Sequence, residues 1–345
     1  MIPQFEPYNL GKYSNAVKAQ IDSGWVGSGK TTKIFEEKFA DYVGAKYGIA
    51  TTSGTAALLV AISAGVIADT TEIALSDYSF IAATNAVRYL HHRPKLYDID
   101  RKTLSLSIDK FIEKPTHCII YINHNGYVGE DLVKLKEFCN NKSILFIEDA
   151  ACALGQRYNG KHAGTFGDIG CFSFSVPKLL TTGQGGMIVT NDTYWNKRCR
   201  ELIDHGSLTW REDGFHRNIG VNFKLNDMAA ALGLAQLERI DELLELRKEI
   251  YNRYITNGIT LHSFGTASTW MNILVDSDAF NLMQKLKENN IQSKMYYRPI
   301  HKAIGLVNRC KEFSSTIYAY HHSLYLPSSL TLTNNQIDRI CEIIQ

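Results

Sequence analysis

The stretch Ser143-Ile144-Leu145-Phe146-Ile147-Glu148-Asp149-Ala150-Ala151 decides the fold class, because an unbroken apolar run ends there in two acids and two small residues. A strand that is apolar at successive positions is typical of a sheet covered on both faces. An acid at the carboxyl end of such a strand is costly to bury without a partner. Side chains alternate along a strand, so only one of Glu148 and Asp149 can serve a given site. Taken alone, a salt-bridged or capping acid is the simpler interpretation.

Similar apolar runs alternate with amphipathic stretches up to about residue 226. The runs predict strands at residues 47–51, 72–76, 94–99, 117–122, 143–147, 169–174 and 187–190. The stretches between them predict helices, among them residues 55–64, 81–90 and 129–139. Strands that alternate with helices imply right-handed crossovers, and therefore an α/β fold with a mainly parallel sheet. Ligands of such sheets bind at the carboxyl ends of the strands.

The pattern changes after about residue 226. Residues 227–253 predict one long helix, with Ala and Leu on one side and charges on the other. The remainder predicts a smaller α+β unit, and no Pro/Gly/Ser-rich linker or repeat separates the two parts. We therefore expect a large domain over residues 1–240 and a small domain over residues 241–345.

Composition excludes several classes of protein. A net charge of +2 over 345 residues gives no field for nucleic acid or an anionic membrane. The seven scattered cysteines include no Cys-x-x-Cys pair, so we predict neither a metal site nor disulfides. Residues 1–7 lack the pattern of a signal peptide, and no apolar run could span a bilayer. We expect a cytoplasmic protein with reduced thiols.

One motif points elsewhere. Gly24-Trp25-Val26-Gly27-Ser28-Gly29-Lys30-Thr31 matches the nucleotide-binding P-loop letter for letter. A working P-loop follows a buried strand, whereas residues 14–23 predict an amphipathic helix that stops at Gly24. A glycine-rich loop after a helix is the favoured interpretation, and tight Mg-ATP binding lost on Lys30→Ala would favour the alternative.

Besides the acid at the end of the strand, two further stretches of the sequence contain candidate functional residues. Thr52-Ser53-Gly54-Thr55-Ala56-Ala57-Leu58 places small residues at a helix start, where free N–H groups can bind an anion; alone it is only a helix cap. Cys171-Phe172-Ser173-Phe174-Ser175-Val176-Pro177-Lys178 leads to a Gly-rich turn, Gly183-Gln184-Gly185-Gly186. Apolar surroundings lower the pKa of an amine and make Lys178 a better nucleophile toward an aldehyde. A lone loop lysine is more often a surface residue.

The three stretches in this order identify a kind of protein more specifically than any one of them does alone. In this order they resemble the sequences of the fold-type-I, pyridoxal 5′-phosphate (PLP) dependent sugar aminotransferases of the DegT/DnrJ/EryC1/StrS family. The resemblance runs over nearly the whole chain, and its opening is especially similar to perosamine synthases. It rests on Ile21-Asp22-Ser23-Gly24-Trp25, Phe35-Glu36-Glu37-Lys38-Phe39, Ser53-Gly54-Thr55-Ala56-Ala57-Leu58, Asp98-Ile99-Asp100, Glu148-Asp149-Ala150-Ala151, Gly164-Thr165-Phe166-Gly167-Asp168, Ser173-Phe174 with Lys178, Gly185-Gly186-Met187 and Ala231-Leu232-Gly233-Leu234-Ala235-Gln236-Leu237-Glu238.

The resemblance implies a seven-stranded sheet, a small α+β domain and a bound PLP. Lys178 matches the family's Schiff-base lysine, and Asp149 matches the acid on the pyridine nitrogen. The residues implied to hold the cofactor are Ser53, Gly54, Thr55 and Ser173 on the phosphate, Phe80 stacked on the ring, and Asn222 reaching the phosphate from a second subunit. A homodimer with shared active sites is therefore implied.

The implied reaction moves an amino group from L-glutamate to a keto-sugar, with pyridoxamine phosphate as the intermediate form of the cofactor. The expected acceptor is a nucleotide-linked 4-keto- or 3-keto-6-deoxyhexose for surface polysaccharide. Arg298, His301 and Lys224 are the expected substrate contacts, although a plain surface loop explains Arg298 and His301 equally well. A small phosphorylated ketone as acceptor, or a non-catalytic PLP-fold protein, are the alternatives.

The chain departs from the family pattern at five positions. Cys152, Leu154, Gln184, Lys224 and Asn123 stand where the family usually has Gln, His, Glu, Arg and His. Lysine cannot reproduce the bidentate grip of arginine on a phosphate. We therefore expect altered contacts to the cofactor's O3′ and to a sugar diphosphate, while Lys178 argues against the family's dehydratase branch, in which histidine replaces this lysine.

Overall fold

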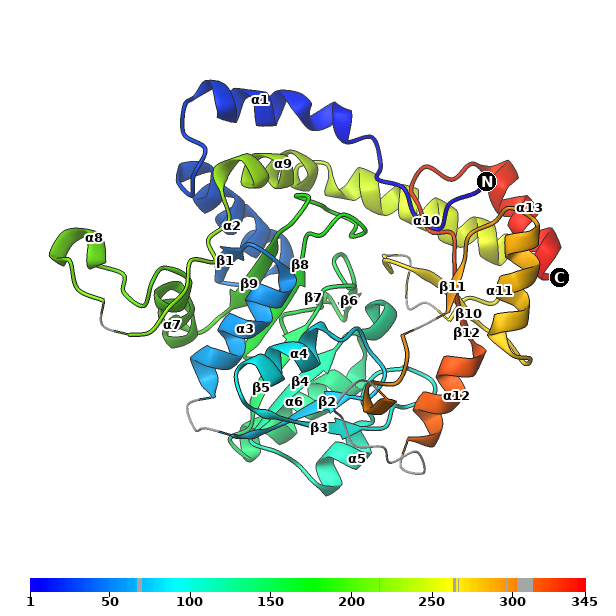
Figure 1. Ribbon diagram of the computed structural model, residues 1–345, viewed down its shortest axis with the longest axis horizontal. Coiled ribbons are helices and arrows are strands. Elements are labelled where there is room, and N and C mark those ends of the chain that lie inside the picture. Colours follow the sequence, from blue (N-terminus) through cyan, green and yellow to red (C-terminus); the bar gives the residue numbers. More distant parts are fainter. Residues whose placement is uncertain (67–69, 217, 263–264, 266, 296, 303–312) are drawn as a thin grey trace.

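A computed structural model describes residues 1–66, 70–216, 218–262, 265, 267–295, 297–302 and 313–345. Its centre is a seven-stranded sheet with the order β1-β9-β8-β5-β4-β2-β3 (Figure 1). In that order the strands are Tyr47–Thr51, Gly186–Thr190, Ile169–Ser173, Leu145–Asp149, Cys118–Ile122, Glu72–Ser76 and Arg93–Tyr97. β9 runs antiparallel to both neighbours and the other pairs are parallel. The predicted α/β fold with a mainly parallel, seven-stranded sheet is confirmed.

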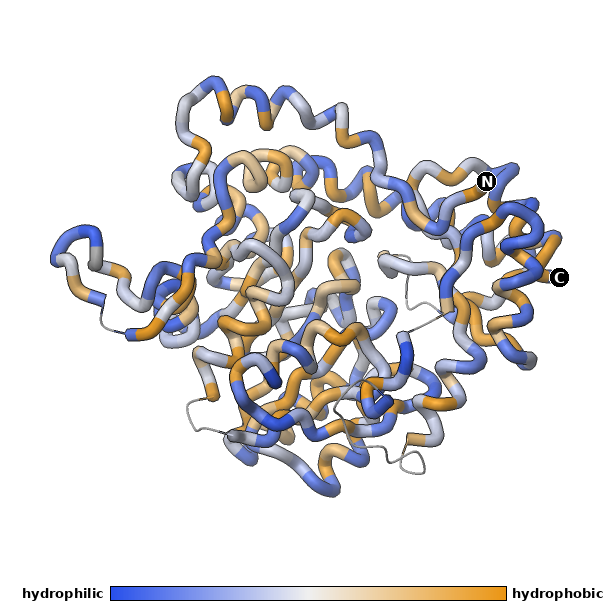
Figure 2. Tube along the Cα trace, in the orientation of Figure 1, coloured by the Kyte–Doolittle hydropathy of each residue, from blue (hydrophilic) through white to orange (hydrophobic). Residues whose placement is uncertain are grey.

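Helices cover both faces of this sheet because its strands are apolar at successive positions. Phe146 and Ile147 are neighbours on β5 and fully buried, yet they belong to different core clusters. The face of Ile147 is covered by α3 (Gly54–Gly65), α4 (Ala82–Tyr89) and α7 (Thr193–Ile203). The face of Phe146 is covered by α2 (Lys30–Val43), α5 (Ile108–Glu113) and α6 (Glu130–Asn141). Figure 2 shows the resulting concentration of hydrophobic residues along the central strands.

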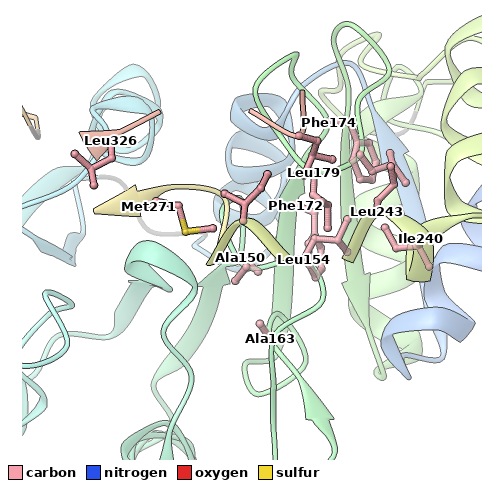
Figure 3. Packing of buried hydrophobic residues seen from close by; sticks show 14 of the residues in the cluster. Ala150, Leu154, Ala163, Phe172, Phe174, Leu179, Ile240, Leu243, Met271 and Leu326 are labelled. Carbon is pink, nitrogen blue, oxygen red and sulfur yellow. The ribbon is translucent and has the colours of Figure 1, made fainter. Parts of the chain in front are cut away.

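A second, antiparallel sheet lies beside the first in the order β10-β12-β11, formed by Met271–Leu274, Ser323–Leu326 and Lys294–Met295. Its helices are α11 (Ala279–Glu288), α12 (Ser314–His322) and α13 (Asn334–Ile344). One core cluster continues from the large sheet into this unit, and its members labelled in Figure 3 include Phe172, Phe174, Leu179, Leu243, Met271 and Leu326. The two parts therefore share a core, and the domain division at residue 240 stays a prediction. No helix of the described residues is long and apolar enough to cross a membrane.

The single long helix predicted over residues 227–253 is wrong. The structure has two helices, α9 (Asp227–Leu237) and α10 (Ile240–Thr256), and Arg239 between them leaves the helical region with φ −121° and ψ 22°. Near the end of α9, the buried Gln236 amide accepts a hydrogen bond from the Thr181 N–H at 3.1 Å and donates one to the Thr181 carbonyl at 2.6 Å. This tertiary contact fixes the end of α9, which a periodic pattern alone could not reveal.

The P-loop-like stretch binds a carboxylate of the protein itself. It follows α1 (Ser14–Asp22), as predicted, and leads into α2. The buried carboxylate of Asp227 accepts hydrogen bonds there from the N–H groups of Gly29 at 2.8 Å, Thr31 at 3.2 Å and Thr32 at 2.9 Å. A protein carboxylate thus takes the place that a bound phosphate would need at this helix start.

Candidate active site

A cavity of about 450 Å³ opens where the parallel strands of the large sheet end. Its walls include the residues that follow β1, β2, β4 and β5, together with the end of β8 and the loop after it. Its far wall comes from the small unit. The predicted site residues that line it are Ser53, Gly54, Thr55, Phe80, Asp149, Ser173 and Lys178. The cavity therefore brings together the three stretches that the sequence singled out.

The start of α3 forms a compact anion cradle. The Ser53 hydroxyl accepts a hydrogen bond from the Ala56 N–H at 3.0 Å and caps the helix. The first N–H groups of a helix have no partner within it, so those of Gly54 and Thr55 can serve a ligand. A Cβ on Gly54 would lie 2.8 Å from the Ser173 Cβ, so only glycine leaves room beside Ser173. The cradle therefore fits a phosphate.

Asp149 is the acid that faces the cavity. Its side chain lies at the end of β5 and accepts a hydrogen bond from the Ala151 N–H at 3.0 Å. Burial raises the pKa of Asp149, and the Ala151 hydrogen bond and the Lys178 charge oppose that rise. A buried carboxylate next to a ligand space is suited to a protonated ring nitrogen, which would restore its charge.

Glu148 points to the opposite face of the sheet, as alternation along the strand predicts. Its fully buried carboxylate accepts hydrogen bonds from the N–H groups of Phe166 at 2.8 Å and Gly167 at 3.2 Å. Burial raises the pKa of Glu148, and these backbone bonds oppose the rise. Glu148 therefore holds a loop in place rather than lining the cavity.

Lys178 projects from the loop between β8 and β9, and its Nζ lies 3.0 Å from the Sγ of Cys152. The expectation of a lowered pKa for this amine is wrong. Burial lowers the pKa of Lys178, but the neighbouring Cys152 together with Tyr297 and Asp149 raises it by more, so the net change is upward. The apolar setting was evident from the sequence, whereas the thiol and the phenol beside the amine were not.

Phe80 is an aromatic side chain that the fold leaves open to the cavity. It is 58% exposed, and its ring centroid lies 5.3 Å from that of Tyr297. Because Phe80 also lines the cavity, the exposed face of its ring is open to a ligand there. Phe80 is therefore placed to stack on a flat, aromatic ligand ring.

Four predicted residues lie outside this cavity. Asn222 is exposed, Lys224 forms an ion pair with Asp204, and Arg298 is exposed on the small unit. His301 is 1% exposed, and its Nδ1 lies 2.6 Å from the Asp77 carboxylate. The structure thus directs the His301 imidazole to Asp77 and not into the cavity of this chain.

The sequence did not single out the far wall of the cavity. It includes Trp270, Lys294, Tyr297 and Tyr325 from the small unit, and no sequence motif links them to Lys178. Lys294 is exposed at the edge of β11, and its Nζ lies 5.9 Å from the Tyr297 ring centroid. Because the Lys294 side chain is exposed and lines the cavity, its ammonium group can reach an anionic ligand there.

His124 is a second missed residue. It lines the cavity directly after Asn123, one position later than the histidine of the family pattern. Its ring stacks on Tyr78 with centroids 5.2 Å apart, and burial lowers the pKa of His124 to about 3. This imidazole is therefore neutral at physiological pH.

Comparison with known proteins identifies the family. The model of the DegT/DnrJ/EryC1/StrS aminotransferase family matches residues 10–345. The chain belongs to this family. As a DegT/DnrJ/EryC1/StrS aminotransferase it is a PLP-dependent enzyme, which agrees with the phosphate cradle, strand-end acid and lysine that meet in the cavity.

Similar proteins extend over the whole chain. The GDP-perosamine synthase of Escherichia coli O157:H7 is 31% identical, with 99% of this chain and 97% of that protein covered. The crystal structure of the aminotransferase TlmJ from Streptoalloteichus hindustanus matches with a TM-score of 0.92 and 27% identity, over 100% of this chain and 98% of that one. Helicobacter pylori PseC, an aminotransferase involved in the biosynthesis of pseudoaminic acid, matches with a TM-score of 0.87 and 26% identity, over 96% and 95%.

Proposed function

We propose that this aminotransferase moves an amino group from L-glutamate to a nucleotide-linked 4-keto- or 3-keto-6-deoxyhexose used for surface polysaccharide. The observation that carries the proposal is that Lys178 and Asp149 line one cavity with an anion cradle. The similarity to a GDP-perosamine synthase over nearly the whole chain supports a sugar acceptor.

Each cavity residue has a distinct task in this proposal. When bound, PLP supplies an electron sink for the charge left when a proton leaves the donor's α-carbon. Ser53, Gly54, Thr55 and Ser173 bind its phosphate, and Phe80 covers its ring. Asp149 keeps the ring nitrogen protonated through its carboxylate.

Lys178 has two tasks. Its Nζ would attach the cofactor when the donor is absent, and as a free amine it would move the proton of the donor's α-carbon. The second task requires a free amine inside the cavity, close to the reacting carbon. The position of Nζ at the cavity wall, near Asp149 and Cys152, meets that requirement.

The far wall suits a charged acceptor. Lys294 is exposed at the cavity rim, and we assign it to the acceptor's diphosphate. Trp270, Tyr297 and Tyr325 offer flat surfaces for a sugar or a base. A small phosphorylated ketone would leave most of this wall unused, so it is the less favoured acceptor.

We further propose a homodimer in which Asn222 reaches the partner's cofactor phosphate. Asn222 follows a segment around α8 (Trp210–Asp213) that protrudes from the body in Figure 1. Phe215 is 69% exposed and Ile219 is 92% exposed on this segment, as is typical of an interface. We propose a cytoplasmic location, in keeping with the free cysteines of the described residues.

A screen of amino acceptors tests the proposal. The purified protein with PLP and L-glutamate is offered GDP-, dTDP- and UDP-linked keto-6-deoxy sugars and dihydroxyacetone phosphate, and products are weighed by mass spectrometry. We expect one nucleotide-linked sugar to gain an amino group in exchange for its keto oxygen, and Lys178→Ala to abolish this. Amination of dihydroxyacetone phosphate alone would favour the small acceptor. PLP binding without any amino exchange would favour a non-catalytic protein.

A further inference from the structure

Cys152 touches the amine that the proposed reaction depends on. Its Sγ lies 3.0 Å from Nζ of Lys178, and it is part of the cavity wall, three residues after Asp149. A thiol can donate to a neutral amine or, as a thiolate, accept from an ammonium group. The contact is therefore compatible with both protonation states that a proton-moving lysine must adopt.

The position of Cys152 is itself fixed from the small unit. Its carbonyl accepts a hydrogen bond from the Thr269 Oγ1 at 3.3 Å, and its side chain packs against a cluster that includes Trp270 and Tyr78. Lys178, by contrast, ends a flexible four-carbon stem, whose ordering costs conformational entropy. A fixed partner for Nζ reduces the number of places where the released amine can lie.

We propose that Cys152 is a positioning residue that holds the Lys178 amine at the cavity wall whenever the amine is not attached to the cofactor. The inference rests on the proposed function, because it assumes that Lys178 is released during each turnover. The ionisable groups that face this pair are Asp149 and Tyr297. The direct hydrogen-bond contact of the Lys178 Nζ is with the Sγ of Cys152, at 3.0 Å.

A chemical probe on the cofactor-free protein tests the contact. Cys152 is partly exposed, whereas the other described cysteines are buried, so iodoacetamide should modify Cys152 before them, and the modified peptide is identified by mass spectrometry. Lys178→Met removes the polar partner of the Cys152 Sγ, so we expect the rate of Cys152 alkylation near neutral pH to change about fivefold, the size expected for loss of one hydrogen bond. Lys18→Met, which removes an exposed lysine of α1 outside the cavity, should leave that rate unchanged.

Kinetics test the positioning role. In rapid-mixing measurements of the glutamate half-reaction, Cys152→Ala should lower the maximal rate about tenfold, with little change in the glutamate concentration for half-maximal rate. It should also move the pH profile of that rate, while the melting temperature and PLP absorbance stay near wild type. Cys152→Ser keeps a donor and acceptor and should recover most of the rate.

Two results would overturn the inference. Alkylation of Cys152 at the same rate with and without Lys178 would show that the contact does not exist. A Cys152→Ala enzyme with the wild-type rate and pH profile would show that the contact does not position the amine. Failure of the proposed function would look different, because the wild-type protein would then exchange no amino group with L-glutamate, while alkylation of the cofactor-free protein would still report the contact between Cys152 and Lys178.

Discussion

The carboxylate of Asp77 lies 2.6 Å from Nδ1 of His301, and both side chains are fully buried. The other carboxylate oxygen accepts a hydrogen bond from the His301 backbone N–H at 2.7 Å. Asp77 directly follows β2, whereas His301 lies in a short helix, η3 (Ile300–Lys302), of the small unit. The pair therefore fastens the two parts next to the cavity wall, where Phe80 and Tyr297 meet.

This pair should make stability depend on pH. Burial raises the pKa of Asp77 to about 6 and its bonds to His301 oppose that rise, so the folded state favours the neutral acid. The stability gained from this group is present below the ordinary pKa of 3.8 and is lost as pH rises through about 6. Asp77→Asn has no titratable carboxyl at this position. We therefore expect the unfolding free energy of the wild type, relative to that of Asp77→Asn, to fall by roughly 1.4 kcal/mol for each unit of pH increase between these two pKa values. Urea unfolding at several pH values measures it, and parallel curves would contradict it.

Gly54→Ala should weaken the cofactor site. The added Cβ would lie 2.8 Å from the Ser173 Cβ, so the cradle must distort. We expect the Kd for PLP, measured by absorbance titration, to rise by about tenfold or more while the fold is kept. Gly27→Ala is the matched control, because its Cβ would meet nothing within 4 Å and its affinity should be unchanged. If the wild type, Gly54→Ala and Gly27→Ala bound PLP with equal affinity, the start of α3 would not be the phosphate site.

We expect the two acids at the end of β5 to have different roles, with Asp149 serving the reaction and Glu148 serving stability. Asp149→Asn keeps the shape of the side chain and loses its charge, so the glutamate half-reaction should slow about 100-fold or more. Glu148→Gln should instead lower the melting temperature, because its carboxylate holds the Phe166 and Gly167 N–H groups. Rapid-mixing kinetics and thermal unfolding of both variants are the measurements. The reverse pattern would mean that Glu148 is the acid of the reaction.

The P-loop-like stretch should matter for stability and not for nucleotides. Asp227→Ala removes the buried carboxylate that accepts three N–H bonds at the start of α2, and should cost about 2 kcal/mol or more of unfolding free energy. Asp278→Ala removes an exposed cap of α11 and should cost about 1 kcal/mol or less. In calorimetry with Mg-ATP, the wild type and Lys30→Ala should give the same result, without tight binding to either protein.

The strands were the most predictable part of the fold. Residues 47–51 and 72–76 were predicted at the bounds of β1 and β2, and 143–147 overlaps β5. Strands buried on both faces carry an unbroken apolar run, and that run is a local signal. The strand-end acid and the helix-start cradle were predictable for the same reason, because each lies directly at the end of such an element.

Contacts between distant residues were not predictable in this way. The break between α9 and α10 depends on Gln236 meeting Thr181, which lies 55 positions earlier. The pairing of His301 with Asp77 joins residues 224 positions apart. No local pattern carries such information, and the upward pKa of Lys178 likewise depends on Cys152 from another loop.

The covalent attachment of the cofactor is the most direct test of the central claim. The protein is mixed with PLP, reduced with borohydride, digested, and analysed by peptide mass spectrometry. We predict one modified peptide, with the pyridoxyl group on Nζ of Lys178, and none in Lys178→Ala. A pyridoxyl group fixed on Lys294 or another lysine, or no fixed cofactor at all, would contradict the account.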